Sequence, residues 1–300
     1  MILVSLHDIP YYFSDRLKLC SLCPIFIASE SRQGNKQNDI VSKFVIKTVH
    51  YETEYQKFRI QEELNILDHL SNEMNIIHFI DNFDLTYKDH ECKFIVTNYY
   101  KNSDLYEYVK KNEDLTEDDK CYIIYQMLEI LQSLKNRKIV HNDIKFQNFI
   151  IKSEKPFQII LTDFEGSQLL SNDEKSDIFG GTPIFESPEV LREEVHDYSS
   201  DLWSLGVNIY YVMFGTFPFD INVSDSKEKI LEKMEKNELK KLKDFISNDA
   251  WELVKSILVF EPDERISVEN ALKLDWFDSI NMIDEKVEIN TIEVNEIKEN

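Results

Sequence analysis

Two short polar segments constrain this chain of 300 residues more than any other feature of its sequence. The first reads HNDIKFQN and places Asp143, Lys145 and Asn148 in one loop, which an apolar run follows. The second reads LTDFEG and holds Asp163. Phosphoryl transfer needs a carboxylate that orients the attacking hydroxyl, a cation beside the transferred group, and a carboxylate and an amide that hold magnesium. The two segments together therefore predict phosphoryl-transfer chemistry in a folded domain.

The composition favours a folded protein in a reducing compartment. Hydrophobic residues make up 42% of the chain, with 14 Tyr and 19 Phe, which argues against disorder. Four Cys in a chain of 300 residues do not make a disulfide framework, and Cys20 and Cys23 lack the second pair that a zinc site needs. We therefore expect an intracellular protein of the cytoplasm or nucleus.

The charge of the chain limits its partners. The formal net charge of -22 disfavours nucleic acid and anionic membrane surfaces, because both would be repelled. No apolar run reaches the roughly 20 residues that span a bilayer, and the first ten residues are too short and too acidic for a signal peptide. The same charge favours basic protein surfaces as partners.

The first hundred residues have the pattern of a sheet with one helix. Short segments rich in β-branched and aromatic residues predict strands at residues 16–22, 24–29, 42–49, 76–84 and 92–100. Residues 54–71 predict a helix between the third and fourth strands. The apolar positions of that helix recur at near-helical spacing and are Tyr55, Phe58, Ile60, Leu64, Leu67 and Leu70.

After Tyr100 the chain is mainly helical. Thr116 and Asp119 form a predicted capping box. The helix that follows has one apolar face made of Cys121, Ile124, Met127, Leu128, Leu131 and Leu134. Short strands are expected around Asn148 and Asp163, and helices resume from about Pro188. The acidic residues 281–300 predict a loosely attached helix or a disordered tail.

Residues 12 to 278 resemble the eukaryotic protein kinases through an ordered set of motifs. In chain order these motifs are VIK ending at Lys47, ELNIL opening at Glu63, HNDIKFQN, TDFEG, GTPIFESPE, DLWSLG and EPDERIS. The resemblance implies an α+β, two-lobed fold, in which a small five-stranded antiparallel sheet and one helix pack over a larger helical lobe. It assigns residues 1–100 to the N-terminal lobe, 101–280 to the C-terminal lobe and 281–300 to the tail.

The resemblance also implies a site for ATP and Mg²⁺. Lys47 would hold the α- and β-phosphates of ATP and would pair with Glu63. The backbone of residues 98–100 would bind adenine. The residues that this register places around the nucleotide are Ile25, Val45, Thr97, Asn98, Tyr99, Tyr100, Asp104 and Ile150.

The catalytic roles follow from the same alignment of motifs. Asp143 would accept the proton of the substrate hydroxyl, and Lys145 would neutralise charge on the transferred phosphoryl group. Asn148 and Asp163 would bind Mg²⁺. Lys145 and Thr182 are typical of serine/threonine kinases rather than tyrosine kinases.

Three further residues resemble the scaffold of the kinase site. Glu189 would pair with Arg265, and Asp201 would hydrogen-bond the backbone of the catalytic loop. These contacts would stiffen the site without touching the nucleotide.

Three departures from the family pattern concern activity. The glycine loop of the family is replaced by Lys18, Cys20 and Cys23, which predicts a weaker phosphate clamp. Asn142 stands where the family has the Arg that binds a phosphorylated activation loop. Glu165 stands where the family has the Gly of the metal loop, so it would stiffen that loop or add negative charge near the phosphates.

The sequence therefore predicts a serine/threonine protein kinase that uses ATP and Mg²⁺. The net charge favours basic protein substrates through long-range attraction, rather than through a defined pocket. The main alternative is a pseudokinase scaffold that binds partners without efficient phosphoryl transfer. A second is a small-molecule phosphotransferase, although that class generally lacks the GTP…SPE segment.

Overall fold

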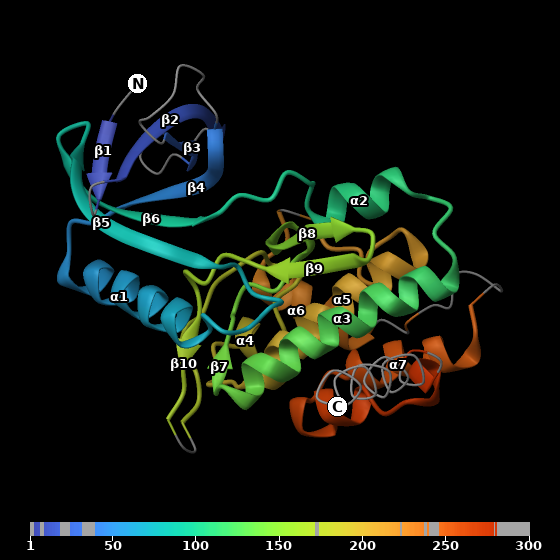
Figure 1. Ribbon diagram of the computed structural model, residues 1–300. Helices are drawn as coiled ribbons and strands as arrows, with labels where there is room; N and C mark the ends of the chain where they lie inside the picture. Colours follow the sequence, from blue (N-terminus) through green and yellow to red (C-terminus); the bar gives the residue numbers. More distant parts are fainter. Residues whose placement is uncertain are drawn as a thin grey trace, which may run out of the picture. The chain divides into compact units, whose positions relative to one another are not determined.

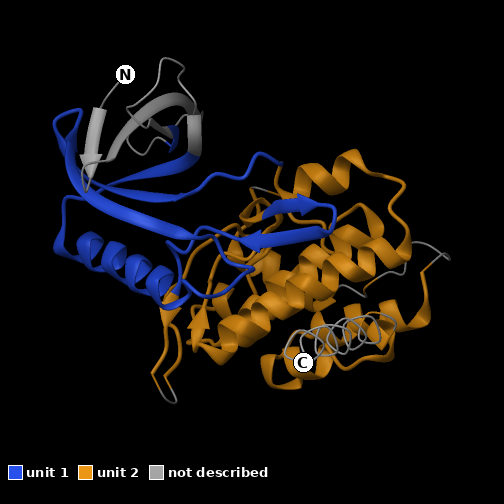
Figure 2. Ribbon diagram, viewed as in Figure 1, with its two compact units in different colours: residues 1–102, 150–167 blue, residues 103–149, 168–300 orange. Residues whose placement is uncertain are grey.

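The computed structural model describes residues 3–6, 9–18, 25–31, 40–171, 174–222, 224–236, 239, 246–278 and 280. The chain divides into two compact units, residues 1–102 with 150–167 and residues 103–149 with 168–300 (Figure 2). The sequence had placed residues 150–167 in the second part, whereas the structure groups them with the first. The tail predicted at residues 281–300 lies outside the described residues.

The first unit is built on an antiparallel sheet of six strands (Figure 1). The strands are β1 (Leu3–Leu6), β2 (Ile9–Lys18), β3 (Ile25–Ser31), β4 (Ile40–His50), β5 (Phe79–Tyr87) and β6 (His90–Asn98). Their order across the sheet is β1-β2-β3-β4-β6-β5. The sheet has one strand more than predicted, because the four residues of β1 pair with the start of β2.

Apolar residues from four strands form the core of this sheet. Ala28, Ile46, Phe94 and Val96 are buried, and the rings of Phe83 and Phe94 stack with their centroids 5.0 Å apart. Aromatic and β-branched residues suit this position because they pack well across neighbouring strands. The core fixes the register that carries Lys47 on β4 opposite Ile95 on β6.

The helix α1 (Glu54–His69) begins with a capping box in which Thr53 and Gln56 exchange hydrogen bonds. Of its predicted apolar face, Ile60, Leu64, Leu67 and Leu70 are buried, whereas Tyr55 and Phe58 are exposed. At about 100° per residue, Ile60, Leu64 and Leu67 fall within about 60° of one another, and Tyr55 and Phe58 fall on the other side. The near-helical spacing therefore predicted the helix, and the structure shows that Tyr55 and Phe58 lie on its exposed side.

A β-hairpin of β8 (Phe149–Glu154) and β9 (Phe157–Leu161) leads to the segment with Asp163. Its second strand is joined to the chain between α1 and β5, because Ile77 N–H donates to the Leu161 carbonyl at 2.8 Å. Leu161 N–H in turn donates to the Asn75 carbonyl at 2.9 Å. These bonds fix the backbone just before Asp163 within the first unit.

The second unit is mainly helical. Its longer helices are α2 (Leu105–Lys111), α3 (Glu117–Asn136), α5 (Tyr198–Phe214), α6 (Lys227–Lys236) and α7 (Asn248–Ile257). Short helices are η1 (Phe146–Asn148), α4 (Pro188–Leu191), η2 (Pro262–Glu264), α8 (Val268–Ala271) and η3 (Asp275–Phe277). The strands β7 (Ile139–Val140) and β10 (Gln168–Leu169) pair antiparallel.

The helices α3 and α5 form the core of this unit. The capping box of Thr116 and Asp119 is present, and all six residues of the predicted face of α3 are buried, which confirms that prediction. Helix α5 approaches α7 closely at Gly206, where a Cβ atom would collide with the side chains of Ile257 and Leu258. A glycine is needed at this crossing.

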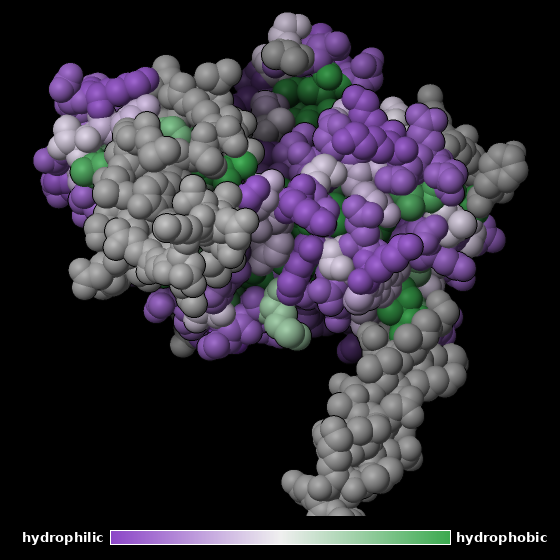
Figure 3. All heavy atoms as spheres, turned by 45° about the horizontal axis from the view of Figure 1, so that its top comes forward, coloured by the Kyte–Doolittle hydropathy of each residue, from purple (hydrophilic) through white to green (hydrophobic). Residues whose placement is uncertain are grey.

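The surface is strongly polar. On the face shown in Figure 3, hydrophilic residues cover most of the described surface, in keeping with the net charge of -22. Among the described residues, no helix combines the length and the apolar character needed to cross a bilayer.

Candidate active site

Lys47 is the centre of a charged cluster in the first unit. Its ammonium lies 3.0 Å from Glu63 on α1, 3.1 Å from Asp163 and 3.0 Å from Glu165. The Glu63 side chain is 5% exposed, whereas those of Asp163 and Glu165 are 41% and 65% exposed. One ammonium therefore faces three carboxylates, which leaves an excess of negative charge.

The charges of this cluster stabilise the protonated lysine. Burial by itself would lower the pKa of Lys47, but the carboxylates of Glu63, Asp163 and Glu165 outweigh it and raise that pKa above its ordinary value. Burial raises the pKa of Glu63, and the Lys47 ammonium opposes that shift. The attraction between the Lys47 ammonium and the Glu63 carboxylate offsets the free-energy cost of removing both charges from water.

Arg59 on α1 holds the segment that follows Asp163. Its guanidinium donates to the carbonyl of Glu165 at 3.2 Å and to the carbonyl of Ser167 at 2.9 Å. Asp163 itself has a φ of 68°, in the left-handed region that Asp and Asn tolerate better than most residues. The backbone turn and the arginine together aim the Asp163 carboxylate at Lys47.

The second unit carries a compact polar loop around Asp143. The Asp143 carboxylate lies 2.5 Å from the Lys145 ammonium. The side-chain amide of Asn148 donates to the Asp143 carboxylate at 3.1 Å and to the Asp143 carbonyl at 2.8 Å. The Asp143 side chain is 22% exposed, so it is open to a reactant. The three residues that the sequence placed in one loop are thus in mutual contact.

Asp201 holds the backbone of this loop through hydrogen bonds. Its buried carboxylate accepts hydrogen bonds from the backbone N–H of His141 at 2.6 Å and of Asn142 at 2.9 Å, which confirms the predicted contact. Burial raises the pKa of Asp201 to about 7, while the two N–H donors oppose the shift. The loop is positioned by backbone bonds, so its side chains stay available.

Asn142 joins the catalytic loop to the segment that follows β10. The Oδ1 atom of Asn142 lies 2.9 Å from the Nε2 atom of His196, and its amide donates to the Ser176 hydroxyl at 3.3 Å. Ser176 and His196 also exchange backbone hydrogen bonds at 2.7 and 3.0 Å. Burial lowers the pKa of His196, so the ring is neutral at physiological pH. Asn142 therefore contacts the segment after β10 through Ser176 and His196, without a phosphorylated residue.

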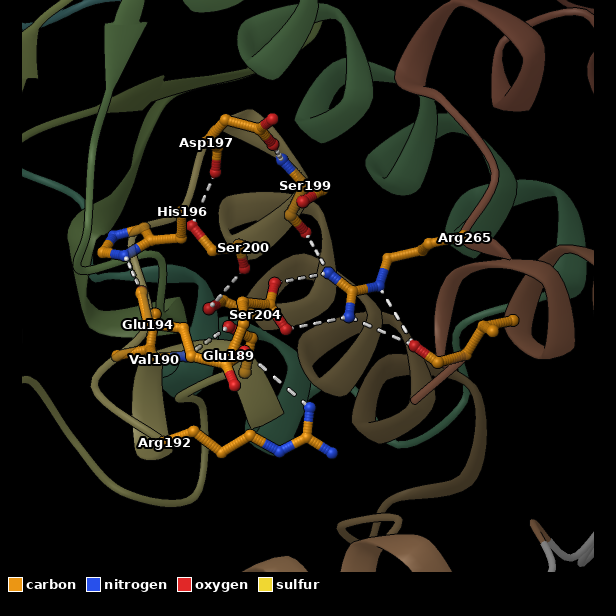
Figure 4. A network of polar contacts seen from close by, with 12 residues as sticks. Glu189, Val190, Arg192, Glu194, His196, Asp197, Ser199, Ser200, Ser204 and Arg265 are labelled. Carbon is orange, nitrogen blue, oxygen red and sulfur yellow. Dashed lines mark hydrogen bonds and ion pairs between the residues drawn. The ribbon is translucent and has the colours of Figure 1, made fainter. Parts of the chain in front are cut away.

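A buried ion pair stabilises the base of this unit (Figure 4). The guanidinium of Arg265 contacts Glu189 at 2.9 and 3.2 Å, as predicted, and also donates to the carbonyls of Ser199 and Val259. Both side chains are almost completely buried. The Nε, Nη1 and Nη2 atoms of Arg265 each donate to an acceptor, as a buried charge requires.

Comparison with known proteins identifies the fold. The protein kinase domain family matches residues 32–277 of the chain. This protein belongs to the protein kinase family.

Its relatives include several named protein kinases. The chain is 26% identical to serine/threonine-protein kinase atg1 of Dictyostelium discoideum, over 73% of this chain and 32% of that protein. It is 31% identical to the calcium/calmodulin-dependent protein kinase cmkA of Emericella nidulans, over 72% of this chain and 52% of that protein. It is 29% identical to the Aurora kinase of Eremothecium gossypii, over 64% of this chain and 51% of that protein. The kinase thus spans from about a third to about half of these relatives.

The residues predicted to surround the nucleotide fall into separate groups. Ile25 and Val45 lie on β3 and β4, and Val45 is opposite Thr97 on β6. Ile150 lies on β8. Asp104 caps α2, where its carboxylate accepts from Glu107 N–H at 2.9 Å, so the predicted contact with ribose would compete with that cap.

The segment predicted to bind adenine has one N–H group to offer. Asn98 N–H donates to the His78 carbonyl at 3.1 Å, and Tyr99 N–H donates to the Lys43 carbonyl at 3.4 Å. Tyr100 N–H has no protein partner among the described residues. Of the three predicted residues, Tyr100 is therefore the one whose N–H is available to a ligand.

Of the residues that replace the glycine loop, Lys18 ends β2, opposite Ile25, while Cys20 and Cys23 lie outside the described residues.

The predicted contact of Thr182 with the catalytic loop is limited to a shared cavity. Thr182 lines the same hollow as Asp143, but its hydroxyl makes no hydrogen bond within the described part of the chain.

The chemistry of the Lys47 cluster fits a divalent cation. Its three carboxylates exceed its one ammonium, and Asp163 is partly exposed, so its oxygens are available to a hard cation. Separately, His50, Glu52 and His90 bring ligand atoms within 4.8 Å of one another, but Glu52 is largely exposed and such surface groupings are common without a metal.

Sequence reasoning missed three residues of this site. Arg59 acts through carbonyl groups more than a hundred residues away in sequence, and His196 contacts Asn142 from 54 positions away. Glu186 lines the cavity beside Asp143. Its acidic side chain within the GTPIFESPE segment was the one available signal.

Proposed function

We propose that this protein is a serine/threonine protein kinase that transfers the γ-phosphoryl group of ATP to hydroxyl groups of proteins. The observation that carries the proposal is the position of Lys47, whose ammonium lies 3.0 Å from Glu63 and 3.1 Å from Asp163. A lysine on a rigid strand, paired in this way, is oriented to bind phosphate groups.

The residues of the first unit bind and orient the nucleotide. Lys47 binds the phosphates of ATP, and Glu63 holds its ammonium in place. Asp163, with Asn148 of the second unit, would hold Mg²⁺, which when bound neutralises the phosphate charge and orients the transferred group. Ile25, Val45 and Ile150 contribute apolar surface for the adenine ring.

The residues of the second unit handle the acceptor. Asp143 orients the acceptor hydroxyl and takes its proton. Lys145, 2.5 Å from Asp143, neutralises negative charge on the transferred group. Asn148 fixes the Asp143 side chain through its hydrogen bond of 3.1 Å. Lys145 in this loop and the names of the relatives favour serine and threonine over tyrosine as acceptors.

The proposal extends to an intracellular compartment. ATP-dependent phosphorylation of proteins uses the intracellular nucleotide pool, and the buried Cys92 and Cys121 are free thiols, as a reducing environment permits.

The decisive experiment measures radiolabelled phosphate transfer to a library of serine and threonine peptides. We expect Asp143→Asn to abolish transfer while binding of Mg·ATP persists, because Asp143 acts on the acceptor and not on the nucleotide. Asp114→Asn, which changes an exposed carboxylate outside the loop, should transfer phosphate at the wild-type rate. Transfer by the Asp143→Asn variant at the wild-type rate would disprove the role of Asp143.

Nucleotide binding is tested separately by thermal unfolding. A ligand present at about 100 times its Kd stabilises the folded state by about 2.7 kcal/mol. We expect Mg·ATP to raise the Tm of the wild type and to leave the Tm of Lys47→Met almost unchanged. A wild-type Tm that does not respond to millimolar Mg·ATP would favour a pseudokinase scaffold.

A further inference from the structure

A cavity opens beside Asp143 within the second unit. Its polar wall contains Asn142, Asp143, Thr182 and Glu186. Counting the part that is open to solvent, the hollow measures about 340 Å³. An acceptor hydroxyl placed at Asp143 would bring its neighbouring residues to this hollow.

Glu186 is the uncompensated charge in the cavity. Asp143 has Lys145 at 2.5 Å, but Glu186 is half-buried and has no hydrogen-bond or ion-pair partner among the described residues. Lys227, the cation whose charge opposes the raised pKa of Glu186, already binds Glu193 at 2.7 Å. A half-buried carboxylate without a partner is costly, and a cation that enters the cavity would relieve that cost.

The electrostatic environment of Glu186 agrees with this geometry. Burial raises the pKa of Glu186, the negative charge of Asp143 raises it further, and the charge of Lys227 opposes both. The cavity lining therefore contains three carboxylates, of which Asp143 has an ammonium partner in Lys145 and Asp201 accepts two backbone N–H groups. A second cation is the chemical group that this environment lacks.

Gly181 keeps the approach to Glu186 open. A Cβ atom at this position would lie 3.5 Å from the Glu186 Oε1 atom and 3.7 Å from the Asn142 carbonyl. The φ of Gly181 is 151°, which side chains rarely adopt. The missing side chain leaves the Glu186 carboxylate and the neighbouring carbonyl accessible from the cavity.

The rest of the lining suits the stem of a long cationic side chain. Ile144, Ile178, Phe185 and Val190 form an apolar wall of the cavity. Lysine and arginine bury their methylene stems against apolar surface while their charged ends seek polar partners. The cavity therefore offers both a wall for the stem and an anion for the charge.

We propose that Glu186 selects protein substrates that carry a lysine or arginine directly next to the phosphorylated serine or threonine. Neighbouring residues of a peptide are about 3.3 Å apart, and a peptide that bends at an acceptor held at Asp143 can direct the long side chain of an adjacent basic residue to the same cavity. This proposal rests on the proposed function of the protein. It replaces the general attraction expected from the net charge with one defined side chain.

The test uses serine peptides that differ only at the two positions flanking the acceptor, with Lys, Arg, Leu or Glu at each. We expect the wild type to phosphorylate the best Lys or Arg peptide with a kcat/KM about tenfold above the matched Leu peptide, as a charged hydrogen bond contributes. Glu186→Gln should reduce that ratio to about twofold or less, and Glu186→Lys should shift the preference to Glu peptides. Because Glu186 makes no hydrogen bond among the described residues, and Gln removes a half-buried unpaired charge, the Gln variant should have a Tm equal to or slightly above that of the wild type.

The matched control is Glu194→Gln, which removes an equal charge from an exposed position outside the cavity lining. It should keep the wild-type preference. Equal kcat/KM values for Lys and Leu peptides in the wild type, or a preference that survives Glu186→Gln, would overturn the proposal.

A binding assay separates this proposal from the proposed function. Fluorescently labelled peptides with Ala at the acceptor position report affinity without phosphoryl transfer. If the wild type phosphorylates no peptide, the proposed activity is wrong. Tighter binding of Lys peptides that is lost in Glu186→Gln would still support the cavity, and equal binding of Lys and Leu peptides would reject it.

Discussion

The two units of this kinase hold their functional residues in different ways. In the first unit, Lys47 faces three carboxylates, two of which are substantially exposed. In the second unit, the buried Asp201 carboxylate holds the backbone of the loop that carries Asp143, and Glu189 and Arg265 form a buried ion pair. The first arrangement is a partly exposed ion-pair cluster with excess negative charge, and the second combines backbone hydrogen bonds to a buried carboxylate with one buried ion pair.

The difference follows from what each region has to do. A group that binds phosphates and a metal must exchange its protein partners for those of the ligand, so weak and exposed ion pairs suit it. A loop that positions an acceptor must stay fixed, and buried polar groups with complete sets of partners provide that rigidity. Burial, rather than the number of charges, should therefore decide the size of each mutational effect.

The largest effect is expected for Arg265→Ala. Removing one partner of a buried pair leaves the Glu189 charge unpaired, which destabilises a protein by about 3–5 kcal/mol. Urea denaturation measures the loss. The exposed Lys236–Glu232 pair provides the control, since Lys236→Ala should change stability by less than about 1 kcal/mol. Similar losses for both variants would break the comparison between buried and exposed pairs.

A smaller loss is expected for Asn142→Ala. It removes the hydrogen bonds to His196 and Ser176 and places alanine at a φ of 62°, where the left-handed backbone costs about 1–2 kcal/mol. We expect a total loss of about 1–3 kcal/mol in unfolding free energy. Asn142→Gly removes the same bonds without that strain, so it should lose less. If the glycine variant is the less stable of the two, backbone strain at Asn142 is not part of its role.

Removing one exposed carboxylate should alter nucleotide binding more than stability. Without Mg²⁺, Glu165→Gln should bind ATP up to about fivefold more tightly, because an exposed ion pair with Lys47 contributes at most about 1 kcal/mol. Isothermal titration with and without Mg²⁺ measures the difference. Glu54→Gln, which changes an exposed carboxylate paired with Lys57, is the control. Weaker ATP binding by Glu165→Gln would show that Glu165 helps to bind the nucleotide.

The smallest effect concerns Glu117, which lies in the second unit but is only partly buried. Burial would raise its pKa, yet hydrogen bonds from Ser247 and Trp276 lower it below the ordinary value. A lowered folded-state pKa gives stability that is present above about pH 4.5 and is lost as the pH falls below it. We expect Glu117→Gln to lose less than about 1 kcal/mol at neutral pH and to show a flatter decline in acid.

Unfolding curves at several pH values test this, with Glu113→Gln, an exposed glutamate of the same region, as the control. If Glu117→Gln lost as much unfolding free energy as Arg265→Ala, membership of the second unit, rather than burial, would determine the size of the mutational effect.

The sequence predicted the features that depend on local pattern or on family motifs. The capping box of Thr116 and Asp119, the buried face of α3 and the Glu189–Arg265 pair are all present. Helical spacing predicted α1 but not which of its apolar residues are buried, and Tyr55 and Phe58 are exposed.

Contacts between distant segments could not be predicted. Arg59 binds backbone carbonyls, and a carbonyl leaves no mark in the sequence of the residue that provides it. His196 and Asn142 meet only because β7, α4 and α5 place them together, and Glu186 becomes notable only once the cavity beside Asp143 is seen. The roles assigned to the residues around ATP remain predictions.

Arg59 connects the helix that carries Glu63 with the segment that follows Asp163. It lies on the same helix as Glu63 and donates to two carbonyl groups of the turn beyond Asp163. An outward rotation of α1 would therefore pull that segment along with it, so Lys47 would lose its glutamate and its aspartate in a single event. Lys47 should therefore be found either with both carboxylates or with neither, and not with one alone. A partner that binds the exposed turn of α1 at Tyr55 and Phe58 would change both contacts of Lys47 together.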